Sequence, residues 1–130
     1  MAEDVMGLLK NDKFASYIGI EVVHAAEGSA EARMRADEKH LNGLGIVQGG
    51  AIFTLADTAF AAASNSREGT AVATNVSIAY CKAAHPGMLF ARAREVSLNR
   101  KLATYLIEVY GEKEGLIALF QGTVYRKQDK

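Results

Sequence analysis

One carboxylate, that of Asp57, is the strongest candidate for chemistry in this sequence. Between His40 and Arg67 it is the only ionisable side chain, halfway along an otherwise apolar and amide-bearing stretch. Burying a carboxylate without a partner costs on the order of several kcal/mol, and an apolar residue would avoid that cost. The position therefore indicates a function for Asp57. The structural alternative is an Asp that caps a neighbouring loop or pairs with an arginine of a strand.

Two glycines, Gly49 and Gly50, stand directly before the apolar part of this stretch. If a helix starts there, the N–H groups of its first turn have no acceptor within the helix. Glycine allows a ligand atom to approach the backbone closely, and the helix dipole favours negative charge at this end. Such amides could stabilise an oxyanion. A plain turn is the alternative, and a Walker A phosphate loop is excluded because no Gly-Lys-Ser/Thr follows.

The stretch that carries Asp57 is predicted to be a buried helix. Its apolar part, residues 51–63, is rich in alanine and is shorter than the roughly 20 residues that cross a bilayer. Because this helix is apolar around nearly its whole circumference, the rest of the domain must enclose it.

The segments on either side of this helix have the length and composition of strands, and a short amphipathic helix over residues 4–14 precedes them. The six expected strands cover residues 19–26, 29–36, 70–80, 89–98, 102–110 and 116–125. Turn signals separate them, at Glu27-Gly28, His85-Pro86-Gly87, Asn99-Arg100-Lys101 and residues 112–115. Connections this short favour antiparallel pairing of consecutive strands.

These elements predict an α+β fold in a single domain over residues 1–130, with an antiparallel sheet of about six strands curled around the central helix. A free sheet edge and any uncovered helix surface need a cover, and a second copy of the chain is the economical candidate. We therefore expect at least a homodimer.

Composition narrows the function further. Fifteen Lys and Arg balance fifteen Asp and Glu, so nucleic acid and anionic membranes are not expected partners. The lone cysteine, Cys81, and the absence of a signal-peptide pattern favour the cytoplasm. His24, His40 and His85 fall in separate elements, so no metal site is expected.

The run from His40 to Ser66, with Asn42, Gly49-Gly50 and Leu-Ala-Asp57, resembles the signature of hotdog-fold acyl-CoA thioesterases of the phenylacetate-degradation type. The likeness extends to the strand order and length of nearly the whole chain. It implies that Asn42 holds the glycine turn, that the Gly49 amide polarises the thioester carbonyl, and that Asp57 is the nucleophile or the general base for water. A small hydroxyl residue in the next strand would assist; Thr74 is the nearest match, with Asn75 beside it.

One residue departs from the family pattern: many relatives have His-Gly-Gly where this chain has Gln48-Gly49-Gly50. Gln48 can donate a hydrogen bond but cannot titrate. A thioester does not require a titrating acid, because a thiol with a pKa near 8.5 leaves as the thiolate. The predicted reaction is hydrolysis of an aryl- or medium-chain acyl-CoA to the free acid and CoA, without a cofactor, in a homodimer or a homotetramer.

Binding residues complete the prediction. Gly50 and Asn75 are expected to bind the substrate, and Phe53 and Phe60 to line the acyl pocket, with Tyr80 as a further candidate. The basic residues Arg92, Arg100 and Lys101 are expected at the CoA phosphates. Two alternatives stay open. One is a non-catalytic acyl-CoA binding or sensing module on the same fold; the other is a thioester hydratase, which ranks lower because the helix has no histidine.

The spacing of Gly49 and Asp57 predicts an active site shared between two chains. Eight positions in a regular helix span roughly 12 Å along its axis, whereas both groups must come within roughly 3 Å of the reacting atoms. Two antiparallel helices across a two-fold axis would place the start of one beside the middle of the other.

Overall fold

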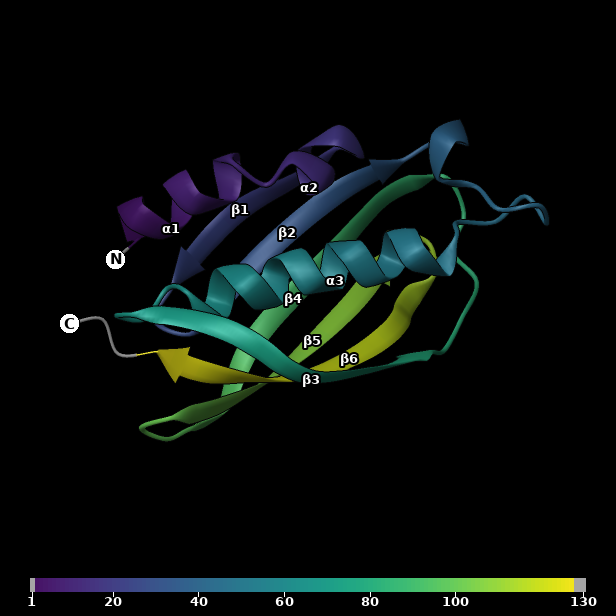
Figure 1. Cartoon of the computed structure of the whole chain (residues 1–130). Coiled ribbons are helices and arrows are strands. Elements are labelled where there is room, and N and C mark those ends of the chain that lie inside the picture. Colours follow the sequence, from purple (N-terminus) through teal and green to yellow (C-terminus); the bar gives the residue numbers. More distant parts are fainter. Residues whose placement is uncertain (1, 128–130) are drawn as a thin grey trace.

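A long central helix, α3 (Gly49–Ser64), lies against one face of a six-stranded antiparallel sheet (Figure 1). The computed structural model describes residues 2–127. The strands, in the order β1-β2-β4-β5-β6-β3, are β1 (Ile20–Ala26), β2 (Ser29–Ala36), β4 (Gly87–Leu98), β5 (Leu102–Gly111), β6 (Gly115–Lys127) and β3 (Thr70–Tyr80). The α+β class, the six-stranded sheet and the central helix predicted from the sequence are confirmed.

Small residues let α3 approach the sheet closely, and one large side chain fills the space between them. Ala56, Ala59 and Ala63 are fully buried. Phe60 packs with tilted geometry on Phe120 at 5.5 Å between ring centroids. It also lies over Gly122, where an added Cβ would come within 2.6 Å of the Phe60 ring. Gly122 of β6 therefore leaves room for the Phe60 ring, which packs α3 against the sheet.

The position of β3 differs from the expectation that consecutive strands pair. It pairs with β6, with Val76 opposite Gly122 and Tyr80 opposite Ala118, while β4 pairs with β2 and β5. The connection over residues 81–86 crosses the end of the sheet instead of making a hairpin. Pairing of β3 with β4 was therefore a wrong prediction: β2 and β5 occupy both edges of β4, and β3 extends the sheet beyond β6.

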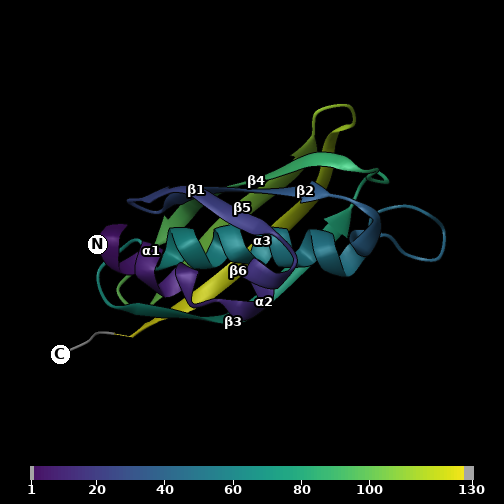
Figure 2. The ribbon, with the colours of Figure 1, turned by 90° about the horizontal axis from the view of Figure 1, so that it is seen from above.

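The N-terminal helix is also divided where one continuous helix was expected. The structure has α1 (Ala2–Lys10) and α2 (Lys13–Tyr17), both beside β1 and α3 (Figure 2). Asp12 causes the break, because its carboxylate accepts the Ala15 N–H at 3.0 Å and caps α2. A short 3₁₀ helix, η1 (Glu38–His40), precedes the loop that leads into α3. No helix within residues 2–127 has the length and hydropathy needed to cross a membrane.

Candidate active site

The first turn of α3 presents two backbone donors without a protein acceptor. Gln48 is the residue before the helix, and Gly49 and Gly50 are its first two residues. Within residues 2–127, the N–H groups of Gly49 and Gly50 make no hydrogen bond, whereas those of Ala51 and Ile52 donate to the Gln48 carbonyl at 2.9 and 3.2 Å. The glycine amides are therefore open to a ligand, and the helix dipole favours a partial negative charge there.

Asn42 shapes the loop that leads to these amides. Its side-chain oxygen accepts the N–H groups of Leu44 at 2.8 Å and Ile46 at 3.3 Å. Its own N–H donates to the Ile46 carbonyl at 2.8 Å, and Gly45 takes the left-handed conformation with φ 81°. This arrangement closes a tight turn over residues 42–46, two residues before Gln48.

His40 anchors the same loop through both of its ring nitrogens. Its buried ring accepts the Asp37 N–H at Nδ1, at 3.0 Å, so the ring proton lies on Nε2, which donates to the Ile18 carbonyl at 2.7 Å. The His40 carbonyl in turn accepts the Gln48 N–H at 2.8 Å. The histidine positions the start of α3 and has no free nitrogen for acid–base chemistry.

Gln48 leaves the amides open. It is exposed, and its side chain makes no cap hydrogen bond to the helix. The side-chain oxygen occupies the space next to Gly50, where an added Cβ would lie 2.7 Å from it. A glycine at position 50 therefore allows Gln48 its present position.

A cavity of about 510 Å³ opens beside the first turns of α3. Apolar and aromatic side chains make most of its wall: Phe14 and Ile18 from the α2 region, Leu41 from the loop, Phe53 from α3 and Tyr80 from the end of β3. Gly50 and Thr54 line it on the helix side. Its composition suits an apolar acyl group placed next to the open amides.

Asp57 lies on the face of α3 that carries Gly50 and Thr54, about one turn beyond Thr54. Within residues 2–127 its carboxylate makes no hydrogen bond and no ion pair, so neither the loop cap nor the arginine pair suggested as structural alternatives is present. Burial raises the pKa of Asp57 above its usual value, and the negative charge of Asp12 raises it further. The helix is continuous from Gly49 to Ser64, so Gly49 and Asp57 remain roughly 12 Å apart along the axis.

The structure does not bring all the predicted residues to this place. Phe60 is only 2% exposed and lies in the core, so it adds no surface to the cavity. Thr74 is at the bulge of β3 and donates to the Thr123 carbonyl at 3.2 Å. It precedes Tyr80 by six residues, about 20 Å along a strand, and Asn75 follows it, opposite Thr123.

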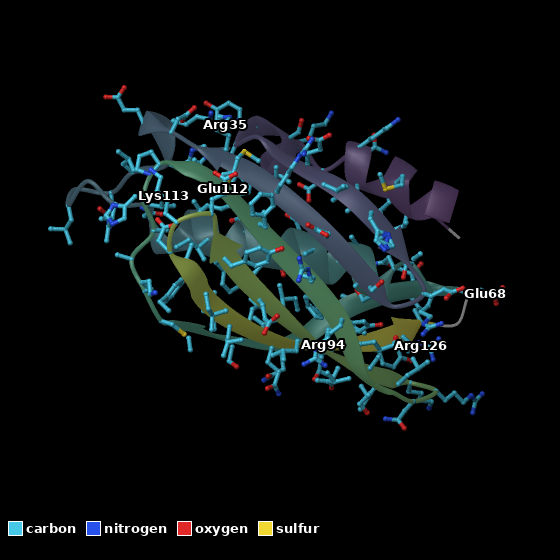
Figure 3. The ribbon with its side chains drawn as sticks, turned by 180° about the vertical axis from the view of Figure 1, so that it is seen from behind. Arg35, Glu68, Arg94, Glu112, Lys113 and Arg126 are labelled. Atoms are coloured by element: carbon cyan, nitrogen blue, oxygen red, sulfur yellow. The ribbon has the colours of Figure 1, made fainter. Side chains whose placement is uncertain are left out.

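The predicted CoA-binding cations are also remote from Gly49 within one chain. Arg92 lies on the outer face of the sheet, stacked 4.9 Å over the Tyr110 ring and hydrogen-bonded to its hydroxyl. Figure 3 shows the neighbouring Arg94 on this same outer face. Arg100 and Lys101 occupy the turn between β4 and β5, beside Arg126. This turn lies near the first residues of β3, at the end of the strand that is far from Tyr80.

Two interactions near the site were not predicted from the sequence: the effect of the Asp12 charge on Asp57, and the hydrogen bond from the Tyr80 hydroxyl to Gly49. Asp12 lies 45 positions before Asp57, and the Tyr80 hydroxyl, which donates to the Gly49 carbonyl at 3.0 Å, is 31 positions away from it. Asp12 carries a local signal, because Asp is a preferred helix cap. Neither interaction has a signature in the local sequence, because the partners are far apart along the chain.

Comparison with known proteins identifies the family. Residues 44–118, more than half of the chain, match the thioesterase superfamily. The chain is 33% identical over 125 residues to the acyl-coenzyme A thioesterase PaaI of Escherichia coli, covering 95% of this chain and 89% of that protein. A protein of Archaeoglobus fulgidus is 48% identical over 120 residues, which are 92% of this chain and 78% of that protein.

Solved structures agree with this assignment. The E. coli PaaI structure superposes with a TM-score of 0.91 at 33% identity, covering 95% of this chain and 91% of that one. A mutant of the phenylacetic acid degradation protein PaaI from Thermus thermophilus gives a TM-score of 0.84 at 42% identity, covering 88% and 99%. The resemblance found in the sequence is confirmed, and the chain belongs to the thioesterase superfamily, with its hotdog fold.

Proposed function

We propose that this protein hydrolyses an aryl- or medium-chain acyl-CoA thioester, with the Gly49 amide as oxyanion donor and Asp57 as nucleophile or general base. The observation that carries the proposal is the pair of unpartnered glycine amides, which open beside an apolar cavity on the helix that also holds a lone carboxylate. The name of the E. coli relative, an acyl-coenzyme A thioesterase, supports the substrate class.

The chemistry needs few groups. As general base, Asp57 takes a proton from water while the water oxygen bonds to the thioester carbon, and the glycine amides stabilise the resulting oxyanion. As nucleophile, the carboxylate itself forms the new C–O bond, and water then hydrolyses the mixed anhydride. In both routes the C–S bond breaks and CoA leaves as a thiolate. The leaving group therefore needs no general acid, and the reaction does not require a titrating residue at the position of Gln48.

The proposal includes a second copy of the chain. Within one copy, Gly49 and Asp57 are too far apart along α3 to reach one carbonyl group. The strand β3 pairs only with β6 in the described sheet, and Val72 and Tyr80 on it are 53% and 52% exposed. Such an edge, next to an incompletely covered helix, favours a homodimer with two shared sites, and two such dimers could form a tetramer.

The remaining predicted residues keep their roles within this dimer. Gly50 and Phe53 would contact the acyl group in the cavity that they line. Thr74, Asn75, Arg92, Arg100 and Lys101 lie away from Gly49 in their own chain, so they would act in a site completed by another copy. The exposed thiol of Cys81 fits the reducing cytoplasm expected from the sequence.

Free thiol released from a panel of acyl-CoA thioesters tests the function. The panel contains phenylacetyl-, benzoyl-, octanoyl- and acetyl-CoA, with the Asp57→Asn variant as the matched control. We expect release from an aryl or medium-chain member by the wild type and at least about 10²-fold less by the variant. Binding of these thioesters without any thiol release by the folded wild type would favour the non-catalytic binding module.

A further inference from the structure

The peptide group between Gly49 and Gly50 is held from outside the helix by Tyr80. The Tyr80 hydroxyl donates to the Gly49 carbonyl oxygen at 3.0 Å. Because a peptide group is planar, with its C=O and N–H on opposite sides, fixing the Gly49 oxygen also fixes the direction of the Gly50 N–H. One of the two open amides thus takes its orientation from a side chain of another element.

The ring of Tyr80 restrains Gly49 as well. A Cβ added at Gly49 would lie 3.2 Å from Tyr80 Cζ and 3.3 Å from its hydroxyl oxygen, so the ring lies directly against this glycine. Glycine has the greatest backbone freedom of any residue, and the N–H groups of Gly49 and Gly50 make no hydrogen bond within residues 2–127. Two consecutive glycines in that turn therefore need an external contact to keep a single orientation.

Tyr80 and the glycine turn belong to one hydrogen-bonded frame. The strand β3 ends at Tyr80, opposite Ala118, and the next N–H, of Cys81, donates to the Ile117 carbonyl at 2.7 Å. Four residues after Tyr80, the Ala84 carbonyl accepts the Val47 N–H at 2.9 Å. The backbone segments that carry the tyrosine and the glycines cannot move independently without breaking these bonds.

We infer that Tyr80 is a positioning residue, which aims the Gly49 and Gly50 amides at the developing oxyanion. This inference rests on the proposed thioesterase function. It predicts a role in the transition state more than in binding, because the amides polarise the carbonyl most strongly as negative charge develops. A tyrosine that only stabilised the fold would instead affect the melting temperature.

Tyr80→Phe removes the hydroxyl and keeps the ring, and Tyr125→Phe is the matched control because Tyr125 is 43% exposed and lacks a hydrogen-bonded hydroxyl in the described chain. Steady-state kinetics use the faster substrate of phenylacetyl-CoA and octanoyl-CoA. We expect kcat of Tyr80→Phe to fall by about 10-fold to 10²-fold, the upper value being the cost of a misplacement of about 1 Å, with KM and the melting temperature nearly unchanged. The Tyr125→Phe variant should match the wild type.

A spectroscopic measurement reads the amides without turnover. A ketone analogue of the same acyl-CoA, with CH₂ in place of sulfur and ¹³C at the carbonyl, is bound to each variant. The wild type should shift the carbonyl resonance downfield, and Tyr80→Phe should lose part of that shift while binding the analogue equally well. An unchanged shift and kcat in Tyr80→Phe would overturn the role of Tyr80, whereas no shift in the wild type would overturn the oxyanion site itself and this inference with it.

Discussion

The isolated carboxylate of Asp57 combines two properties that oppose each other. Burial and the charge of Asp12 raise its pKa, so its ionised form is less stable in the folded chain than in water. A base or nucleophile of raised pKa is also more reactive once ionised. The residue therefore carries a cost to folding that only a function explains.

Asp57→Asn should abolish most activity and stabilise the fold. We expect thioester hydrolysis to fall by at least about 10²-fold. Because the pKa of Asp57 is raised in the folded state, its ionisation destabilises the protein above that pKa, and the neutral amide removes this cost. The melting temperature at pH 7 should rise, and the difference from the wild type should shrink as the pH is lowered toward the usual Asp value. A variant with normal turnover would exclude a catalytic Asp57.

Asp12 is expected to tune the reaction without touching the substrate. Asp12→Asn removes a negative charge that raises the pKa of Asp57, and it keeps a side chain that can cap α2. The acidic limb of the kcat/KM profile should therefore move to lower pH, by only part of the total shift because burial is the larger cause. A pH–rate series with Asp37→Asn as a control, whose carboxylate caps η1, checks this; an unmoved limb would contradict the electrostatic coupling.

The residues that could be predicted from the sequence are those with local signatures. Asp57 was identifiable because no other charge lies near it along the chain, and Gly49 because it precedes a helix-forming run. Phe60 could not be separated from Phe53 in this way. Both are aromatic residues on the same helix, and only the packing of the sheet shows that Phe60 fills the core while Phe53 reaches the cavity.

At the scale of elements, the sequence predicted where each strand lies along the chain better than it predicted which strands pair in the sheet. The hairpin at Glu27-Gly28 was expected and forms, with both residues at positive φ, 51° and 84°. The order of β3 and β4 was wrong because the rule for short connections uses only chain length. It contains no information about β2 and β6, the strands that β4 and β3 pair with across the fold.

The packing of Phe60 of α3 over Gly122 of β6 gives a prediction about the stability of the fold. Gly122→Ala would place a methyl group 2.6 Å from the Phe60 ring, which Phe120 and Tyr105 hold in place. Overpacking of this kind should destabilise the fold by about 1–3 kcal/mol in chemical denaturation. Gly43→Ala, where no atom lies within 4 Å of the added Cβ, is the control and should change little. Equal stability of both variants would contradict the described packing.

At the scale of the whole molecule, one chain holds both halves of the proposed site but cannot join them. The amides of Gly49 open at the start of α3, while Asp57 lies two turns further along the same continuous helix. A second copy in the antiparallel orientation would place the Gly49 amide of one chain beside the Asp57 carboxylate of the other. The same pairing would cover the free edge of β3, so assembly and catalysis would depend on one interface.

Two inactive variants allow the shared site to be tested directly. Gly49→Pro deletes the amide N–H at the first helical position, where proline fits the backbone, and Gln48 before it is already extended at φ −65° and ψ 140°. Gly49→Ala is its control, because it adds a Cβ against Tyr80 but keeps the N–H. Asp57→Asn removes the carboxylate from the other half of the site.

The decisive measurement is thioester hydrolysis by a mixture of Gly49→Pro and Asp57→Asn subunits, with exchange of chains verified by native mass spectrometry. In a mixed dimer one site would contain both defects and the other neither. Random exchange of equal amounts should therefore restore about a quarter of the wild-type activity, since half of the dimers are mixed and each has one intact site. Verified mixed dimers that stay inactive would contradict a site built from Gly49 of one chain and Asp57 of the other.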